Sequence, residues 1–142
     1  MAKTKLHLAF LWHQHQPMYK NPVNGYYEMP WVRLHAAKDY YDLAAILDDF
    51  PRIKFNINLV PSLMLQLDDY ASGAAKDRFM EVALKPVQSL KPDEIVFIVK
   101  NFFMANAATK IKPYPRYREL YAMRGRFDSP EELARISSQF KK

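Results

Sequence analysis

The sequence predicts an α/β fold, in which the first βαβ portion of a larger parallel sheet or barrel is followed by a helix-rich segment. Two short runs of β-compatible residues flank one long helical pattern, which is the order of a parallel βαβ unit. After Pro61, by contrast, the apolar residues recur at helical spacing. Two strands alone do not make a stable parallel sheet with covered faces. We therefore expect a truncated part of a larger fold, with residues 1–62 as the βαβ unit and 63–142 as the helical segment.

The βαβ unit is expected to begin with a buried strand over residues 5–11, where the apolar run is broken only by a histidine. Prolines and an Asn-Gly pair mark residues 13–30 as a loop. Residues 31–50 have helical periodicity, and Pro51 stops that helix. Apolar and polar residues then alternate over residues 54–60, which predicts the second strand.

The helical segment is expected to hold five helices. Their predicted ranges are residues 62–70, 74–85, 92–107, 115–124 and 129 to the C-terminus. Pro92 is followed by two carboxylates, which is typical of a helix start, and Gly125 is placed to end the fourth helix.

The composition excludes several classes of protein. The 142 residues include no cysteine, so disulfides and thiolate metal sites are excluded. No apolar stretch approaches the roughly 20 residues of a membrane span, and the N-terminal apolar run is not followed by a small-residue cleavage site. We expect a cytoplasmic protein without a membrane partner.

The formal net charge of +6 raises the question of nucleic-acid binding. Basic residues and tyrosines are interleaved over residues 110–126, a combination compatible with single-stranded nucleic acid. The same spacing fits an amphipathic helix with a solvated basic face. Because no nucleic-acid motif accompanies it, we expect no nucleic-acid partner.

The densest polar cluster is His13-Gln14-His15-Gln16-Pro17, at the end of the first predicted strand. Residues i and i+2 of a strand point the same way, so His13 and His15 are expected to share one face. The carboxyl end of a barrel strand is where barrel enzymes build their active sites. An imidazole there can hydrogen-bond a sugar hydroxyl or bind a metal. A pair of structural histidines at a strand end is the alternative.

A catalytic zinc site needs three protein ligands, and His35 is the nearest candidate for the third. Asp39 follows it by four residues and would lie on the same helix face. The spacing permits a metal site without requiring one, so we expect no metal and no cofactor.

Trp31, Arg33 and His35 form a second candidate set at the start of the first helix. An indole stacks on a pyranose, and a guanidinium is a fixed fork of donors for hydroxyls. Alternatively, Trp31 packs at the helix start and Arg33 is solvated. Asn56 and Asn58 share one strand face, where they could line the same site or satisfy backbone groups.

The carboxylates do not identify a catalytic pair. Glycoside hydrolysis needs two carboxyls facing each other. Asp48-Asp49 and Asp68-Asp69 are expected to be solvated on helix faces, and nothing orients Glu28 or Asp39.

Four segments, in order, resemble glycoside hydrolase family 57. The sequence LWHQHQPMY over residues 11–19 resembles that family's first signature, an H-x-H-x-P block that ends strand one. The α-amylase-like branch of the family is similar over residues 30–42, 56–63 and 101–106, the last continued by residues 112–117. The resemblance therefore covers nearly the whole chain.

The resemblance implies the first part of a (β/α)7 barrel that acts on an α-glucan or maltooligosaccharide by a retaining mechanism, by hydrolysis or by glucan transfer. His15 matches the first-signature histidine of the sugar-binding subsite, and His13 is its partner. With Trp31, Arg33 and His35 they make up the expected substrate-binding set.

The family's catalytic Glu and Asp belong to later signatures, and no match to those occurs before Lys142. We therefore expect no catalytic residue in this chain and no activity from it alone. A non-catalytic carbohydrate- or partner-binding module and a histidine-based metal enzyme are the alternatives. An exposed incomplete sheet edge would favour self-association.

Overall fold

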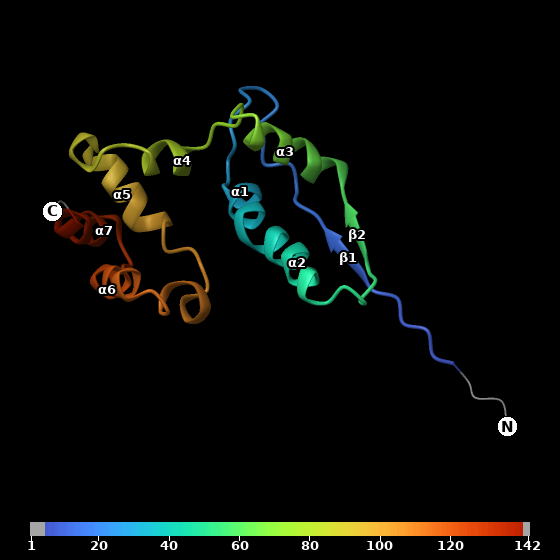
Figure 1. Ribbon diagram of the computed structural model, residues 1–142. Coiled ribbons are helices and arrows are strands. Elements are labelled where there is room, and N and C mark those ends of the chain that lie inside the picture. The colour runs from blue at the N-terminus through green and yellow to red at the C-terminus, as the bar shows by residue number, and fades with distance from the viewer. Residues whose placement is uncertain (1–4, 141–142) are drawn as a thin grey trace. The chain divides into compact units, whose positions relative to one another are not determined.

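The computed structural model describes residues 5–140. Its contacts divide the chain into two compact units, Met1–Arg78 and Phe79–Lys142 (Figure 1). The first unit is a mixed helix and sheet structure, which agrees with the predicted α/β class. It also includes the helix that follows the second strand, so the two units divide after Arg78.

A two-stranded parallel sheet organises the first unit. Strand β1 (Leu11–Gln14) pairs with strand β2 (Asn56–Leu59). In this register Leu11 lies opposite Asn56, and His13 lies opposite Asn58. The predicted strand order and the parallel direction are therefore confirmed.

The predicted extent of the first strand is wrong. Residues 5–10 carry no strand assignment, and Leu6 and Leu8 are 84% and 72% exposed. The apolar run has β propensity, but a strand also needs a partner for its backbone groups. Here β2 begins opposite Leu11. Toward the N-terminus, the last bond between the two segments among the described residues is the one that Asn56 N–H donates to the Phe10 carbonyl, at 2.9 Å. For the same reason, burial of this strand on both faces is not observed.

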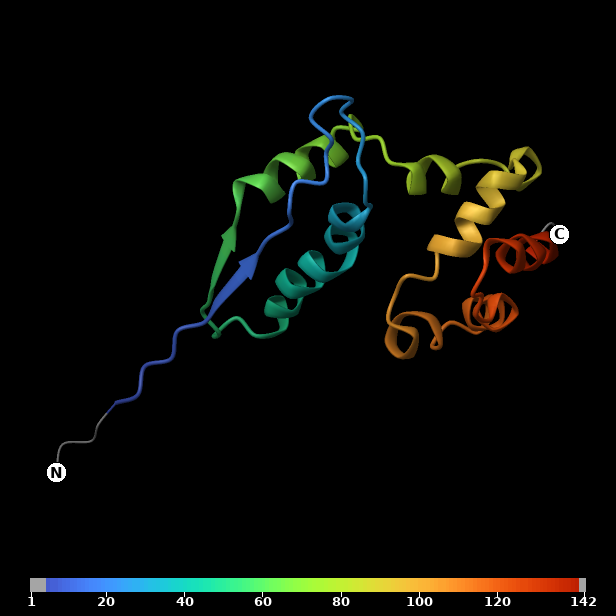
Figure 2. The ribbon, with the colours of Figure 1, turned by 180° about the vertical axis from the view of Figure 1, so that it is seen from behind.

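The helical stretch between the strands covers residues 31–49, close to the predicted 31–50. It is assembled from four consecutive pieces: α1 (Trp31–His35), a π-helical turn (Ala36–Tyr40), α2 (Tyr41–Ala45) and a 3-10 turn (Ile46–Asp49). Figures 1 and 2 show it running beside the two strands. Helix α3 (Pro61–Ala71) starts directly after β2 and packs against α1.

Gln66 of α3 holds the loop that leaves β1. Its side chain is fully buried at 0% exposure. The amide Nε2 donates to the Pro17 carbonyl at 2.9 Å and to the Ser62 carbonyl at 2.8 Å, while Oε1 accepts from Tyr19 N–H at 2.8 Å. Ser62 Oγ also donates to the Gln16 carbonyl at 2.9 Å. The backbone of residues 16–19 is thus fixed by two side chains of one helix.

The rest of the predicted loop is folded back on itself. Lys20 and Tyr27 form an antiparallel bridge, and Gly25 supplies the positive φ of 70° at the turn between them. Lys20 Nζ and the Tyr27 hydroxyl donate to the same Asp69 Oδ2, at 2.6 and 2.8 Å. The expectation that Asp69 is solvated is therefore wrong, because this hairpin covers its side chain.

The second unit is helical. Its elements are α4 (Arg78–Ala83), a 3-10 turn (Val87–Ser89), α5 (Pro92–Asn101), a π-helical turn (Ala107–Ile111), α6 (Pro115–Arg124), α7 (Pro130–Ser137) and a 3-10 turn (Ser138–Phe140). The prediction for residues 115–124 is confirmed, whereas the predicted helices over 74–85 and 92–107 are each shorter at one end or both.

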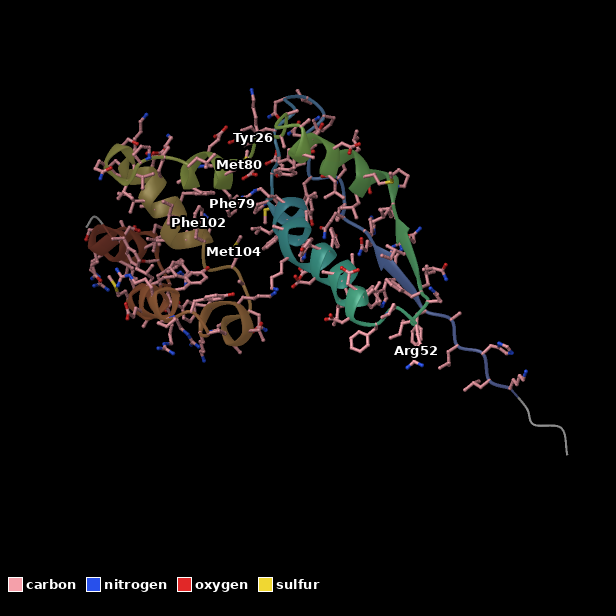
Figure 3. The ribbon with its side chains drawn as sticks, viewed as in Figure 1. Tyr26, Arg52, Phe79, Met80, Phe102 and Met104 are labelled. Atoms are coloured by element: carbon pink, nitrogen blue, oxygen red, sulfur yellow. The ribbon has the colours of Figure 1, made fainter. Side chains whose placement is uncertain are left out.

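Apolar side chains of α5 and α7 form the core of this unit. Val99, Leu133 and Ile136 are buried together, and Phe127 packs against them. A second contact is aromatic: Phe79 and Phe102, labelled in Figure 3, stack with centroids 5.9 Å apart and ring planes 12° apart. No helix among residues 5–140 is long and apolar enough to cross a membrane.

The buried amide of Gln66 gives a test of how the loop is held. Replacing Gln66 by Leu fills a similar volume but leaves the Tyr19 N–H and the Pro17 carbonyl without their partner. We expect the free energy of unfolding to fall by about 2–4 kcal/mol, measured by urea denaturation. The control is Met64→Leu at an exposed position of the same helix, with an expected change below about 0.5 kcal/mol. Equal stability of the two variants would show that the loop is held in another way.

Candidate functional site

His13 is fixed by a neighbour on the second strand. It lies opposite Asn58 in the sheet, and its Nδ1 is 2.6 Å from Asn58 Oδ1. An amide oxygen can only accept a hydrogen bond, so the imidazole Nδ1–H donates. Asn58 is therefore in contact with the histidine cluster.

His15 follows β1 and lies against His13. The two ring centroids are 5.6 Å apart with an edge-to-face angle of 61°, and both residues are exposed. Gln14, between them, is 6% exposed. The alternation of a strand thus continues through this segment, and the two imidazoles lie together as predicted.

The start of α1 carries a second group. Trp31 and His35 are one turn apart, with ring centroids separated by 6.3 Å. His35 Nδ1 donates to Asp39 Oδ2 at 2.5 Å, so the predicted common face of His35 and Asp39 is confirmed. Tyr40, whose ring lies 6.1 Å from His35, accepts a hydrogen bond of 3.0 Å from Gln16 Nε2. That bond joins this group to the histidine loop.

Arg33 is directed to a buried carboxylate. Its Nε lies 3.5 Å from Asp77 Oδ2, and Asp77 is fully buried at 0% exposure. The Tyr70 hydroxyl donates to the same oxygen at 3.0 Å. About a third of the Arg33 side chain, 32%, is exposed. The alternative of a fully solvated Arg33 is therefore wrong, because its charge compensates a buried anion.

Sequence reasoning missed Asp77 and Gln66. Asp77 lies in a short connection between two helices, with basic residues on both sides, which is typical of a solvated segment. It is buried because Tyr27 forms a bridge with it, and Tyr27 N–H donates to the Lys76 carbonyl at 2.8 Å. These contacts join segments distant in the sequence, so no local pattern signals them.

The acidic and phenolic groups under the loop have shifted pKa values. Hydrogen bonds from Lys20 and then from Tyr27 hold the pKa of Asp69 below its usual value. Burial, followed by the nearby carboxylate of Asp69, raises the pKa of Tyr27. Burial and then Asp77 raise the pKa of Tyr70. Both phenols therefore remain protonated donors, and Asp69 remains an acceptor well into the acid range.

The described side chains do not form a metal centre. Within residues 5–140, no group of three His, Cys, Asp or Glu side chains is placed to hold a metal ion. His35 in particular has its Nδ1 occupied by Asp39, and His13 has its Nδ1 occupied by Asn58.

In the comparison with protein families, the model described as glycosyl hydrolase family 57 matches residues 9–132. The matched range includes both strands and all five candidate sugar-binding residues. No curated protein and no solved structure matches the chain.

The ion pair of Asp69 predicts how stability depends on pH. A carboxyl whose folded-state pKa is lowered stabilises the fold above its unfolded pKa of about 3.9 and loses that contribution as the pH falls through the folded value. We expect Asp69→Asn to be less stable than the wild type near about pH 7, with a difference that shrinks below about pH 4.

Urea unfolding at a series of pH values measures this difference. Asp68→Asn, at the exposed neighbouring position, is the matched control and is expected to follow the wild-type curve. A deficit of Asp69→Asn that stays constant from about pH 7 to about pH 2.5 would contradict the proposed origin of the stabilisation.

Proposed function

The chain belongs to glycosyl hydrolase family 57, and we propose that it supplies sugar-binding residues to a retaining, α-glucan-active glycosidase of which it forms the N-terminal part. Family membership indicates glycosidase activity. That the substrate is an α-glucan, either hydrolysed or transferred, is our proposal. It is supported by the resemblance of residues 11–19 to the family's first signature.

The observation that carries this proposal is the pair of exposed, adjacent imidazoles of His13 and His15 at the carboxyl end of β1. Imidazole nitrogens are good partners for sugar hydroxyls. The loop after β1 leads to α1, whose first residue Trp31 offers an indole face for a pyranose ring. In βα units this end of the sheet is where substrates bind.

The whole fold that we propose is a (β/α)7 barrel. Support comes from the parallel pairing of β1 and β2 with a helix between them, which is the repeating unit of such a barrel. Within the described residues each strand has one paired edge, so each can accept a further strand on the other side.

The carboxylates of this chain support a binding role rather than a bond-breaking role. Retaining glycosidases need a nucleophile and an acid/base about 5–5.5 Å apart, facing the sugar. Near the site, Asp39 accepts from His35, and Asp69 accepts from Lys20 and Tyr27. Glu28 accepts from Asn21 Nδ2 at 3.1 Å. We propose that the catalytic Glu and Asp are supplied from outside this chain.

The proposal is tested by adding maltoheptaose to the chain. We expect binding without turnover, measured by titration calorimetry and by analysis of released reducing ends. Trp31→Ala and His15→Ala are each expected to weaken binding about tenfold, because each removes one direct contact with the sugar.

His7→Ala, an exposed histidine before β1, is the matched control and is expected to leave the affinity unchanged. Hydrolysis of maltoheptaose by this chain alone would disprove the division between binding and catalysis. Absence of binding would remove the proposed sugar site itself.

A further inference from the structure

We propose that Asn58 is a positioning residue that fixes the tautomer of His13, so that this histidine presents an unprotonated Nε2 to the candidate sugar site. The identity of the ligand rests on the function proposed above. The tautomer itself depends only on the contact between the two strands.

The register of the sheet makes this contact a fixed one. His13 and Asn58 are direct partners across a parallel ladder, and both lie inside their strands, with a further pair on either side. Their side chains leave the sheet on the same face, which brings Nδ1 to 2.6 Å from Oδ1. Neither backbone can shift without breaking the ladder.

The chemistry of the pair determines the position of the proton. The amide oxygen of Asn58 has only lone pairs to offer, so the hydrogen of this bond belongs to His13 Nδ1. A neutral imidazole carries one N–H. Its Nε2 therefore carries a lone pair and can accept a hydrogen bond from a hydroxyl group.

His35 provides an internal comparison within the same unit. Its Nδ1 donates to the carboxylate of Asp39, which is also an obligate acceptor. Both histidines therefore use Nδ1 for a protein partner and keep Nε2 for a ligand, although one partner is an amide and the other an anion. Each hydroxyl of a sugar can donate a hydrogen bond, so a sugar can pair with the Nε2 atoms of both His13 and His35.

The tautomer is measurable without any ligand. In two-bond ¹H–¹⁵N correlation spectra of the ¹⁵N-labelled chain at about pH 8, above the ordinary histidine pKa of about 6.5, the two neutral tautomers give different nitrogen shifts. We expect the Nδ1–H pattern for His13 and for His35. An Nε2–H pattern for His13 in the wild-type chain overturns the proposal, whatever any variant does.

Three substitutions separate positioning from a merely structural role. Asn58→Asp keeps an acceptor and is expected to keep the Nδ1–H tautomer. Asn58→Leu keeps the volume without the acceptor, and His13 is expected to become a mixture of tautomers while His35 is unchanged. Asn56→Leu, on the same strand face but opposite Leu11, is the matched control and is expected to leave His13 unchanged.

Titration with maltoheptaose distinguishes this inference from the proposed function. We expect Asn58→Leu to weaken binding about tenfold and Asn58→Asp to stay within about threefold of the wild type. Unchanged affinity and an unchanged His13 tautomer in Asn58→Leu overturn the role of Asn58 and leave the sugar site standing. If Asn58→Leu changes the tautomer of His13 but the wild-type chain does not bind maltoheptaose, the role of Asn58 is supported and the sugar site is disproved.

Discussion

The buried amide of Gln66 is the interaction on which the candidate site depends. A loop that turns sharply at the end of a strand leaves backbone groups without ladder partners, and burying them unpaired is costly. Gln66 supplies both an acceptor for Tyr19 N–H and a donor for the Pro17 carbonyl from one side chain. Because Pro17 is the last residue of the histidine block, the direction in which His15 leaves the sheet is set from α3.

A second constraint fixes the other end of the loop. Two carboxylates, Asp69 and Asp77, lie under the hairpin and are each compensated by one cation and one tyrosine hydroxyl: Lys20 with Tyr27, and Arg33 with Tyr70. A buried carboxylate without such partners would be strongly destabilising. Arg33 therefore links the first turn of α1 to the buried Asp77 beneath the loop. Trp31 belongs to the same turn and is held in place with it.

The sequence predicted what local periodicity and motif spacing determine. The helix over residues 31–50, the helix over 115–124 and the shared face of His35 and Asp39 depend on neighbours within a turn, and the structure agrees with all three. The strand over residues 5–11 and the solvated Asp69 were wrong because pairing and burial are decided by distant segments. The partner of Asn58 depends on the register of the sheet, and the partners of Gln66 depend on how α3 packs against the loop after β1; spacing alone gives neither.

The same contacts support our proposal that this chain binds a sugar and does not cleave it. A catalytic carboxyl must be free to face the substrate, and a general acid must release its proton near the working pH. Asp69 meets neither condition, since Lys20 and Tyr27 cover it and lower its pKa. Asp39, for its part, accepts a hydrogen bond from His35 Nδ1. The imidazoles of His13 and His15 are exposed, and the Nδ1 atoms of His13 and His35 already have protein partners. Such groups would match the hydroxyls of the proposed glucan in its ground state, and under our proposal the groups that stabilise the transition state are supplied from outside this chain.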